Sequence, residues 1–233
     1  MKIVSKLSFS TIFLDVTQEQ YSSFNKKCNL TRWYAYTVLI KFICMEKYMA
    51  AYTYDRRRAY EYALVWAYRR NPLFIDFTGI GGNCTNFVSQ CILAGSCIMN
   101  FTTTFGWYYI SSEDRAPAWS GVEFLYNFLT TNEGEGPFGS EQDVSTLRVG
   151  DVVQLSDEMG DYYHTLLVVG NNRGDILLAA QSNDAFARPL STYNYSGVRG
   201  IHIDGYRTEF GPCDCYEELI SGRELNFCGG DRR

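Results

Sequence analysis

The sequence predicts an α+β domain in which helices pack on a small antiparallel sheet. From about residue 54 to residue 130, apolar residues recur at the three- and four-residue spacing of amphipathic helices. Beyond residue 150, short β-branched and apolar runs are bounded by turn residues, which is typical of strands. Because the strands follow the helices instead of alternating with them, an antiparallel sheet is favoured over a parallel one.

The first predicted helix begins after Asp55, a residue type that caps helix N-termini. Ala59 and Trp66 fall on its apolar stripe. The pair Asn71–Pro72 disfavours helical backbone, so this helix is expected to end near Arg70.

The second helix is predicted to begin at Cys84, directly after the glycine-rich loop 79–83. This loop lacks the Gly-Lys-Ser/Thr ending of a phosphate-binding loop. Phe87 and Cys91 lie on the apolar stripe of the helix, and Gly95 is a candidate for its C-terminal stop.

A third helix is predicted from Ser120, since Ser120 and Glu123 match a capping box and Trp119 and Phe124 match a hydrophobic staple. The glycine-, serine- and acid-rich residues 130–146 that follow are expected to form a loop.

Four strands are predicted, over residues 151–155, 163–169, 176–180 and 198–203. Residues 171–174 form a turn sequence between two of them and predict a hairpin. If all four lie in the loop, His164 is opposite Gln181, and Asn183 is a diagonal neighbour on the same face. A change of one residue in the pairing register would place Gln181 on the opposite face of the sheet from His164.

Charge and hydropathy exclude two classes of protein. The net charge of −5 divides into +4 over residues 1–53 and −9 over the rest. An acidic body of this kind disfavours binding to a nucleic-acid backbone, so no nucleic-acid partner is expected. No uninterrupted apolar run reaches the roughly 18 residues of a membrane span, and no integral membrane span is predicted.

Residues 1–53 are expected to be an N-terminal extension or a leader. The apolar patch 7–14 is followed by no small-residue cleavage site, and Lys41 interrupts a second apolar run. There is no convincing signal peptide. Met45 and Met49 offer alternative starts just before the first clear helix.

The eight cysteines have irregular spacing and do not predict a disulfide scaffold. Cys213, Cys215 and Cys228, with His202 upstream, offer ligands for a zinc site, although a C-x-x-C pair is absent. The other interpretation is that these tail cysteines are free or paired in disulfides.

Cys84, His164 and an amide side chain form a candidate site for nucleophilic catalysis. Backbone N–H groups at a helix start stabilise a thiolate and can hold an oxyanion. His164 would be the base, and Gln181 or Asn183 would fix its tautomer. Each residue also has a purely structural interpretation. Cys84 would be part of the apolar stripe of its helix, and His164 a polar residue at the edge of a strand. Gln181 and Asn183 would be solvent-facing polar residues at the end of a strand.

Several blocks of the sequence resemble a bacterial amidase domain family. Gly81–Gln90 reads G-G-N-C-T-N-F-V-S-Q, which matches the family block except that Asn83 replaces Asp. Further similar blocks lie at residues 54–63, 70–72, 93–95, 107–109, 119, 149–153 and 164–169.

This resemblance implies a papain-like cysteine hydrolase related to the NlpC/P60 and CHAP cell-wall enzymes. It makes Cys84 the nucleophile and His164 the base. Gln181 and Asn183 fall where CHAP-type relatives carry Glu and then Asn, although amidase members often have His at the position of Gln181. The implied substrate is a peptide or amide bond of peptidoglycan, and the implied location is the cell envelope or outside the cell.

The expected organisation is an extension over residues 1–53, a papain-like amidase domain over 54–206 and a cysteine-containing tail over 207–233. No metal and no organic cofactor are expected in the reaction. Two alternatives stay open: the same residues acting on a non-wall amide or as an acyltransferase, and a non-catalytic binding module that retains the fold.

Overall fold

The computed structural model describes residues 49–223 of the chain. The helices are α3 (Arg56–Trp66), α4 (Cys84–Ser96), α5 (Pro117–Ser120), α6 (Val122–Thr131) and α7 (Tyr216–Ser221). The strands are β1 (Ala50–Tyr52), β2 (Gly136–Gln142), β3 (Val152–Ser156), β4 (Tyr162–Asn172), β5 (Asp175–Ala180), β6 (Ala185–Pro189) and β7 (Gly197–Thr208). Two 3₁₀ turns are η1 (Val144–Thr146) and η2 (Leu190–Thr192).

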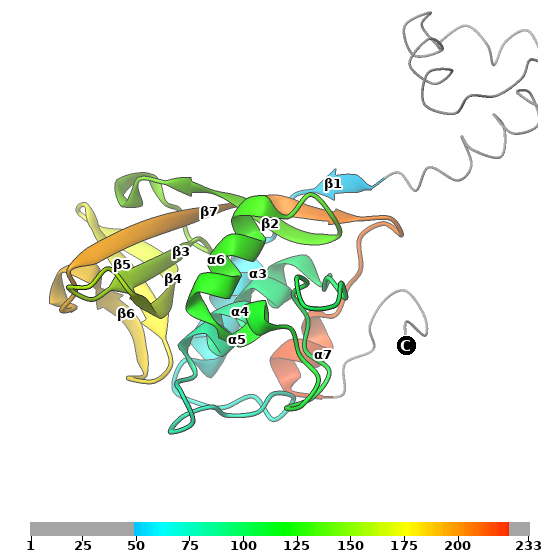
Figure 1. Ribbon diagram of the computed structural model, residues 1–233, viewed down its shortest axis with the longest axis horizontal. Helices are drawn as coiled ribbons and strands as arrows, with labels where there is room; N and C mark the ends of the chain where they lie inside the picture. The colour runs from blue at the N-terminus through cyan, green and yellow to red at the C-terminus, as the bar shows by residue number, and fades with distance from the viewer. Residues whose placement is uncertain (1–48, 224–233) are drawn as a thin grey trace, which may run out of the picture. The chain divides into compact units, whose positions relative to one another are not determined.

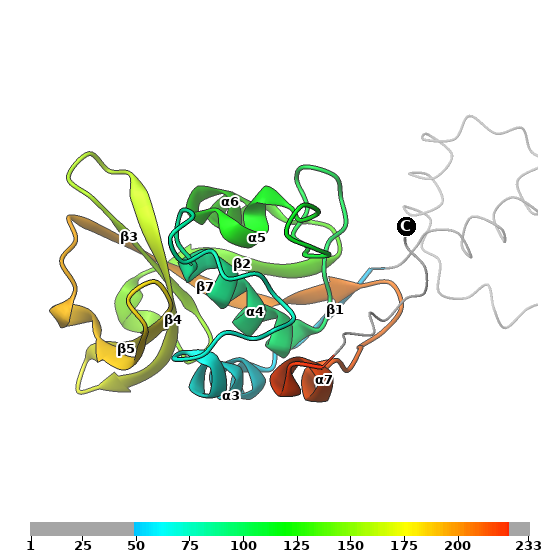
Figure 2. The same ribbon diagram turned by 90° about the horizontal axis from the view of Figure 1, so that it is seen from below.

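The strands of the described region form one curled antiparallel sheet in the order β1-β7-β3-β4-β5-β6, with β2 on the other edge of β7. The long strand β7 runs from β1 and β2 at one end of the domain to β3 at the other (Figure 1). Helices α3 to α6 gather beside it (Figures 1 and 2). The predicted α+β class with an antiparallel sheet is therefore confirmed.

Two apolar cores lie on opposite faces of the central strands. The larger core joins the helices to one face of the sheet and includes Val152, Leu167 and Ala179. The smaller core fills the curl of β3 to β5 and includes alternate residues of the same strands, such as Leu166. Helix α4 is buried along all 13 of its residues, so its N-terminus is fixed by packing on every side.

The first two helices begin where predicted. Asp55 caps α3 by accepting a hydrogen bond from the Arg58 N–H. The expectation that Gly95 stops α4 is wrong, because the helix continues to Ser96 and ends at Cys97 in the left-handed conformation. Gly95 instead permits close approach, since a Cβ there would lie 2.2 Å from the Tyr54 ring.

The predicted start of the third helix is wrong. Ser120 ends the short helix α5, Gly121 is extended, and α6 begins without a side-chain cap. The Ser120 hydroxyl accepts from Arg115 Nε, and Glu123 pairs with Arg199 instead of closing a capping box. The predicted loop 130–146 is also wrong in part, because β2 lies within it.

The four predicted strands are confirmed as β3, β4, β5 and β7, with ends that differ by up to five residues. Strands β1, β2 and β6 were not predicted. Strand β2 reads G-P-F-G-S-E-Q, which has turn and acidic residues that disfavour strands. Its backbone pairing with β7 overrides this local preference. Strand β1 lies inside the range assigned to the N-terminal extension.

The predicted hairpin register is wrong. The turn is the two-residue Arg173–Gly174, with Asn172 opposite Asp175. A bulge between Val168 and Gly170 then shifts the pairing by one residue, so that Leu167 lies opposite Ala179. The two changes together turn Gln181 to the face of the sheet that carries the helices.

A disulfide between Cys97 and Cys215 joins the end of α4 to the start of α7, across a sequence separation of 118 residues. The predicted zinc site is therefore wrong, because Cys215 has no free thiolate to offer. The third candidate ligand, Cys228, lies outside the described residues.

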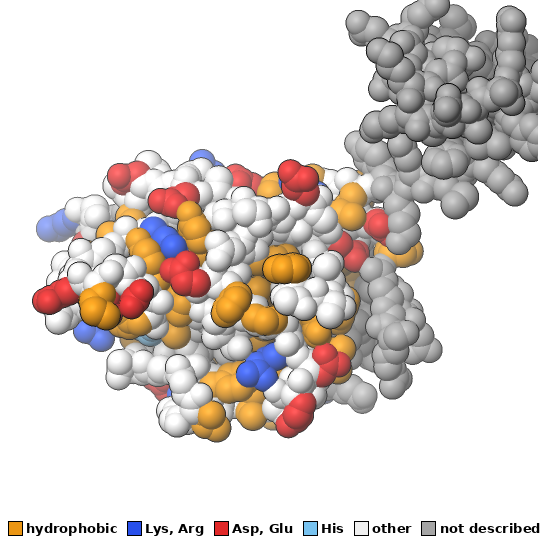
Figure 3. All heavy atoms as spheres, in the orientation of Figure 1, with side chains coloured by type: hydrophobic (Ala, Val, Ile, Leu, Met, Phe, Trp, Pro, Cys, Tyr) orange, Lys and Arg blue, Asp and Glu red, His pale blue; other side chains and the backbone are white. Residues whose placement is uncertain are grey.

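Exposed hydrophobic side chains form separate patches on the face that carries α5 and α6 (Figure 3). The large exposed hydrophobic residues of the described region include Phe105, Ile110 and Phe124. Within residues 49–223, none of the helices has the length and apolar character that crossing a membrane requires.

Candidate active site

Cys84 is the first residue of α4 and is 7% exposed. The loop before it turns through Gly79, Gly81 and Gly82, which all have a positive φ. No side chain caps α4, so the first-turn N–H groups stay free to bind a negatively charged group. This arrangement suits a thiolate and an oxyanion at the sulfur, as the sequence predicts.

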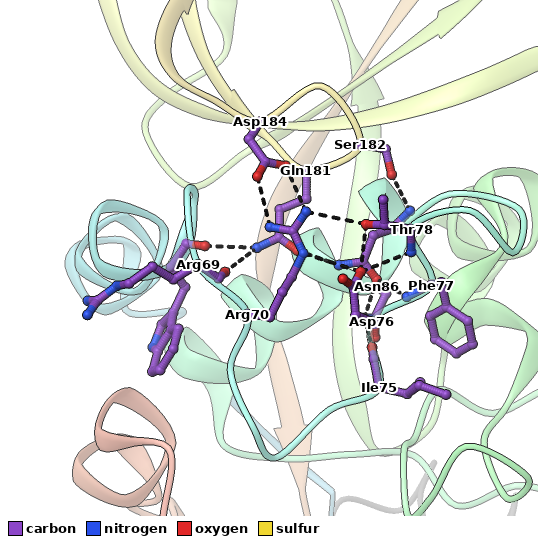
Figure 4. Close-up of polar contacts among 12 residues, drawn as sticks. Arg69, Arg70, Ile75, Asp76, Phe77, Thr78, Asn86, Gln181, Ser182 and Asp184 are labelled. Carbon is purple, nitrogen blue, oxygen red and sulfur yellow. Dashed lines mark hydrogen bonds and ion pairs between the residues drawn. The ribbon is translucent and has the colours of Figure 1, made fainter.

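Asn83 precedes Cys84 and binds the loop and the sheet instead of capping the helix. Its Oδ1 accepts from the Phe77 N–H at 3.0 Å and from Asn86 Nδ2 at 2.8 Å. Its Nδ2 donates to Gln181 Oε1. Gln181 Nε2 in turn donates to the Arg69 carbonyl oxygen, among the contacts drawn in Figure 4. Asn83 and Gln181 are thus bonded to each other.

A second set of contacts fixes the glycine-rich loop to the turn after β5 (Figure 4). Arg70 forms a bidentate pair with Asp184, with both N–O distances at 3.0 Å, and an ion pair with Asp76. The Ser182 hydroxyl accepts from the Asn83 N–H. The residues on both sides of Cys84 are therefore held in place before any substrate binds.

We expect Asn83→Asp to lower the free energy of unfolding by about 2–4 kcal/mol. The change puts a carboxylate against Gln181 Oε1, and Gln181 cannot reverse its amide because Nε2 donates to the carbonyl oxygens of Trp66 and Arg69. Urea unfolding measures the effect. The matched control is Asn183→Asp at an exposed position, where we expect the free energy of unfolding to change by less than about 0.5 kcal/mol. Equal effects at the two positions would contradict a stabilising role for the hydrogen bond between Asn83 and Gln181.

His164 lies near the start of β4 and is 8% exposed. Its ring lies against Tyr163 and Tyr193, and its Nε2 is buried without a hydrogen-bond partner in the described structure. The next residue, Thr165, contacts Thr85 of α4, with 2.9 Å between the hydroxyl oxygens. Since side chains alternate along a strand, His164 lies on the face opposite α4.

Burial, with a smaller contribution from nearby Arg188, lowers the pKa of His164 from 6.5 to about 4. The imidazole is therefore neutral at pH 7. The unpartnered ring nitrogen is a free proton acceptor, but the lowered pKa makes the buried imidazole a weaker base than an exposed histidine.

The same pKa shift predicts a loss of stability in acid. The unfolded chain binds a proton at His164 near pH 6.5, whereas the folded chain binds it near pH 4. The stabilisation is complete above pH 6.5, and about 3 kcal/mol of it is lost as the pH falls to 4. We expect the difference in unfolding free energy between wild type and His164→Phe to change by this amount. A difference that does not change with pH would contradict the lowered pKa of His164.

The structure brings the predicted residues together only in part. Within residues 49–223, no hydrogen bond joins His164 to Cys84, Gln181 or Asn183. The Cys84 sulfur contacts Thr85 Oγ1 at 3.8 Å. Gln181 is 1% exposed and its amide is fully bonded elsewhere, whereas Asn183 is exposed.

Sequence reasoning missed the buried polar chain beneath Cys84. This chain runs from Thr85 through Thr165 to Gln154 of β3, all of them 0% exposed. The available signal is Gln154 itself, a polar residue in the middle of the apolar run Val152–Leu155.

Comparison with known proteins identifies the family. A model of the family described as "Putative amidase domain" matches residues 53–203. The chain belongs to this family. It is also similar to the uncharacterized protein YhbB of Bacillus subtilis (strain 168), with 29% identity over 146 residues. That match covers 61% of this chain and 46% of YhbB, so the chain corresponds to about half of that relative. No solved structure matches significantly.

Family membership suggests amide-bond hydrolysis. The match spans helices α3 to α6, with Cys84 at the start of α4, and all the strands from β2 to β6, and it ends within β7. Both candidate residues Cys84 and His164 therefore lie inside the amidase domain.

Proposed function

We propose that this protein is a cysteine-dependent amide-bond hydrolase that cleaves peptide or amide bonds of peptidoglycan. The observation that carries the proposal is the position of Cys84, at the uncapped N-terminus of a fully buried helix in a member of an amidase family. A thiolate needs a positive environment, and free N–H groups provide one.

In the proposed reaction the Cys84 sulfur attacks the carbonyl carbon of the scissile amide, and its proton passes to His164. Backbone N–H groups at the start of α4 hold the oxyanion. His164 then gives the proton to the leaving amine as the C–N bond breaks, leaving a thioester. Water, deprotonated by His164, attacks the thioester carbonyl carbon. The C–S bond then breaks, the acid product leaves, and the proton on His164 returns to the Cys84 sulfur.

His164 must turn toward α4 for this chemistry. The geometry supports such a movement, because the last residue of β4 paired with β5 on this side is Leu167. His164 therefore has no pairing partner in β5, although it is paired with Leu155 of β3. Gln181 has no free amide group to orient the imidazole, which leaves Asn183 of the same turn as the candidate for that role.

The proposal extends to a papain-like fold of the NlpC/P60 and CHAP type and to the location of the protein. The fold part is supported by the nucleophile helix packed against an antiparallel sheet. The location part is supported by the disulfide between Cys97 and Cys215. Disulfides persist in oxidising compartments, which favours the cell envelope or the extracellular space.

Purified peptidoglycan incubated with the protein tests the substrate. We expect mass spectrometry to detect wall fragments with new amine termini, and we expect none with Cys84→Ala. Release by both proteins would exclude Cys84 as the nucleophile. Cleavage of simple amides with intact peptidoglycan would favour a non-wall substrate, and transfer to an added amine in place of water would identify an acyltransferase.

A second candidate function is a non-catalytic binding module, favoured by the lack of a hydrogen bond between Cys84 and His164. It predicts that wild type and Cys84→Ala sediment equally with insoluble peptidoglycan and that neither releases fragments. Fragment release by wild type alone would exclude it.

A further inference from the structure

We propose that Thr85 is a further catalytic residue, which donates its hydroxyl hydrogen to the Cys84 sulfur and so stabilises the thiolate. The inference rests on the proposed function, since it concerns the same sulfur. Thr85 Oγ1 is 3.8 Å from Cys84 Sγ and is fully buried, so water does not compete for its hydrogen.

A series of buried hydrogen bonds that begins at Arg199 sets which atom donates in this hydrogen bond. Arg199 Nε can only donate, and it donates to Gln154 Oε1 at 2.8 Å. The Gln154 amide is thereby oriented, and its Nε2 donates to the Val122 carbonyl oxygen at 2.8 Å and to Thr165 Oγ1 at 3.3 Å. Thr165 thus receives a hydrogen from Gln154.

Thr165 must then place its own hydrogen elsewhere. Its remaining partner in the described structure is Thr85 Oγ1 at 2.9 Å. Thr85 accepts this hydrogen, and the remaining partner for its own hydrogen is the Cys84 sulfur. A chain in which each oxygen both accepts and donates in one direction strengthens its last bond, and a bond to a charged acceptor is stronger than one to a neutral acceptor.

Contacts near the protein surface hold Arg199, the first donor in this series of hydrogen bonds. The Arg199 guanidinium lies between the rings of Tyr126 at 3.6 Å and Tyr162 at 3.7 Å, and it pairs with Glu123 at 3.0 Å. These contacts hold the donor that orients Gln154. Arg199, Gln154 and Thr165 are positioning residues in this proposal, because they act on the sulfur only through Thr85.

The experiment measures how fast iodoacetamide alkylates Cys84 at about pH 6, with peptide mapping by mass spectrometry to separate Cys84 from the other cysteines. Thr85→Val removes the donor. Thr85→Ser keeps it. Thr165→Val removes the same Thr–Thr hydrogen bond from the other side but leaves the Thr85 hydroxyl able to reach the sulfur.

We expect Thr85→Val to slow alkylation about tenfold and Thr85→Ser to react at about the wild-type rate. Thr165→Val should slow alkylation by only about threefold, because the Thr85 hydroxyl still reaches the sulfur but has lost the donor that orients it. Equal rates in Thr85→Val and Thr165→Val, fast or slow, would overturn the role of Thr85. The urea-unfolded chain provides the reference. If wild-type Cys84 reacts no faster than this reference, the proposed nucleophile itself fails, which is a separate result.

Discussion

Cys84→Ser is expected to lower the rate of amide hydrolysis by about 10⁴-fold or more while the protein stays folded. Serine preserves the size of the side chain, so packing at this site, which is 7% exposed, is retained. A hydroxyl is a much weaker acid and nucleophile than a thiol, so the attack on the amide carbonyl in the proposed reaction is lost. The measurement is the release of amine termini under single-turnover conditions.

The matched control for this variant is Cys91→Ala, which removes the other free cysteine of the same helix. Cys91 is 0% exposed inside the core, and burial raises the pKa of its thiol well above the ordinary value. We expect this variant to lose about 1 kcal/mol of stability and to keep its activity. Activity that depends on Cys91 and survives in Cys84→Ser would refute the assignment.

Removal of the disulfide by Cys97→Ser with Cys215→Ser is expected to lower the free energy of unfolding by about 3–5 kcal/mol. The bridge closes a long loop, since its cysteines are 118 residues apart. In the chain-entropy model, a cross-link over so long a loop removes much of the freedom of the unfolded chain. The bridge also holds α7, whose Leu219 is fully buried against the helical core.

Urea unfolding of the oxidised wild type and of this double variant measures the effect. Wild type treated with a reductant is the control, and it should match the double variant. A difference below about 1 kcal/mol between the oxidised wild type and the variant would contradict a stabilising role for the bridge.

The parts of the fold that were predicted are those in which local chemistry and packing agree. The cap at Asp55, the start of α4 and the apolar strands β3 to β5 follow from side-chain periodicity and capping. Strand β2 was missed because its order comes from backbone pairing with β7, a contact between distant parts of the chain. The bulge in β4 was missed for the same reason, and with it the register.

For the candidate site, the sequence predicted the position of Cys84 at a helix start but not the contacts of the other residues. Cys84 lies at the helix start that the glycine-rich loop indicates. Gln181, however, bonds to Asn83, because a one-residue shift in a strand reverses the face of each side chain. The roles of Thr85 and Gln154 follow only from which buried donors and acceptors meet, which requires the tertiary structure.

The most direct test of the central claim is mass spectrometry of the intact protein quenched in acid during turnover of wall peptides. The account predicts a covalent acyl adduct that peptide mapping places on Cys84 in wild type. It predicts no adduct in His164→Ala, because His164 must protonate the leaving amine before the thioester can form. Turnover by wild type without an adduct on Cys84, or an adduct on another residue, would contradict the account.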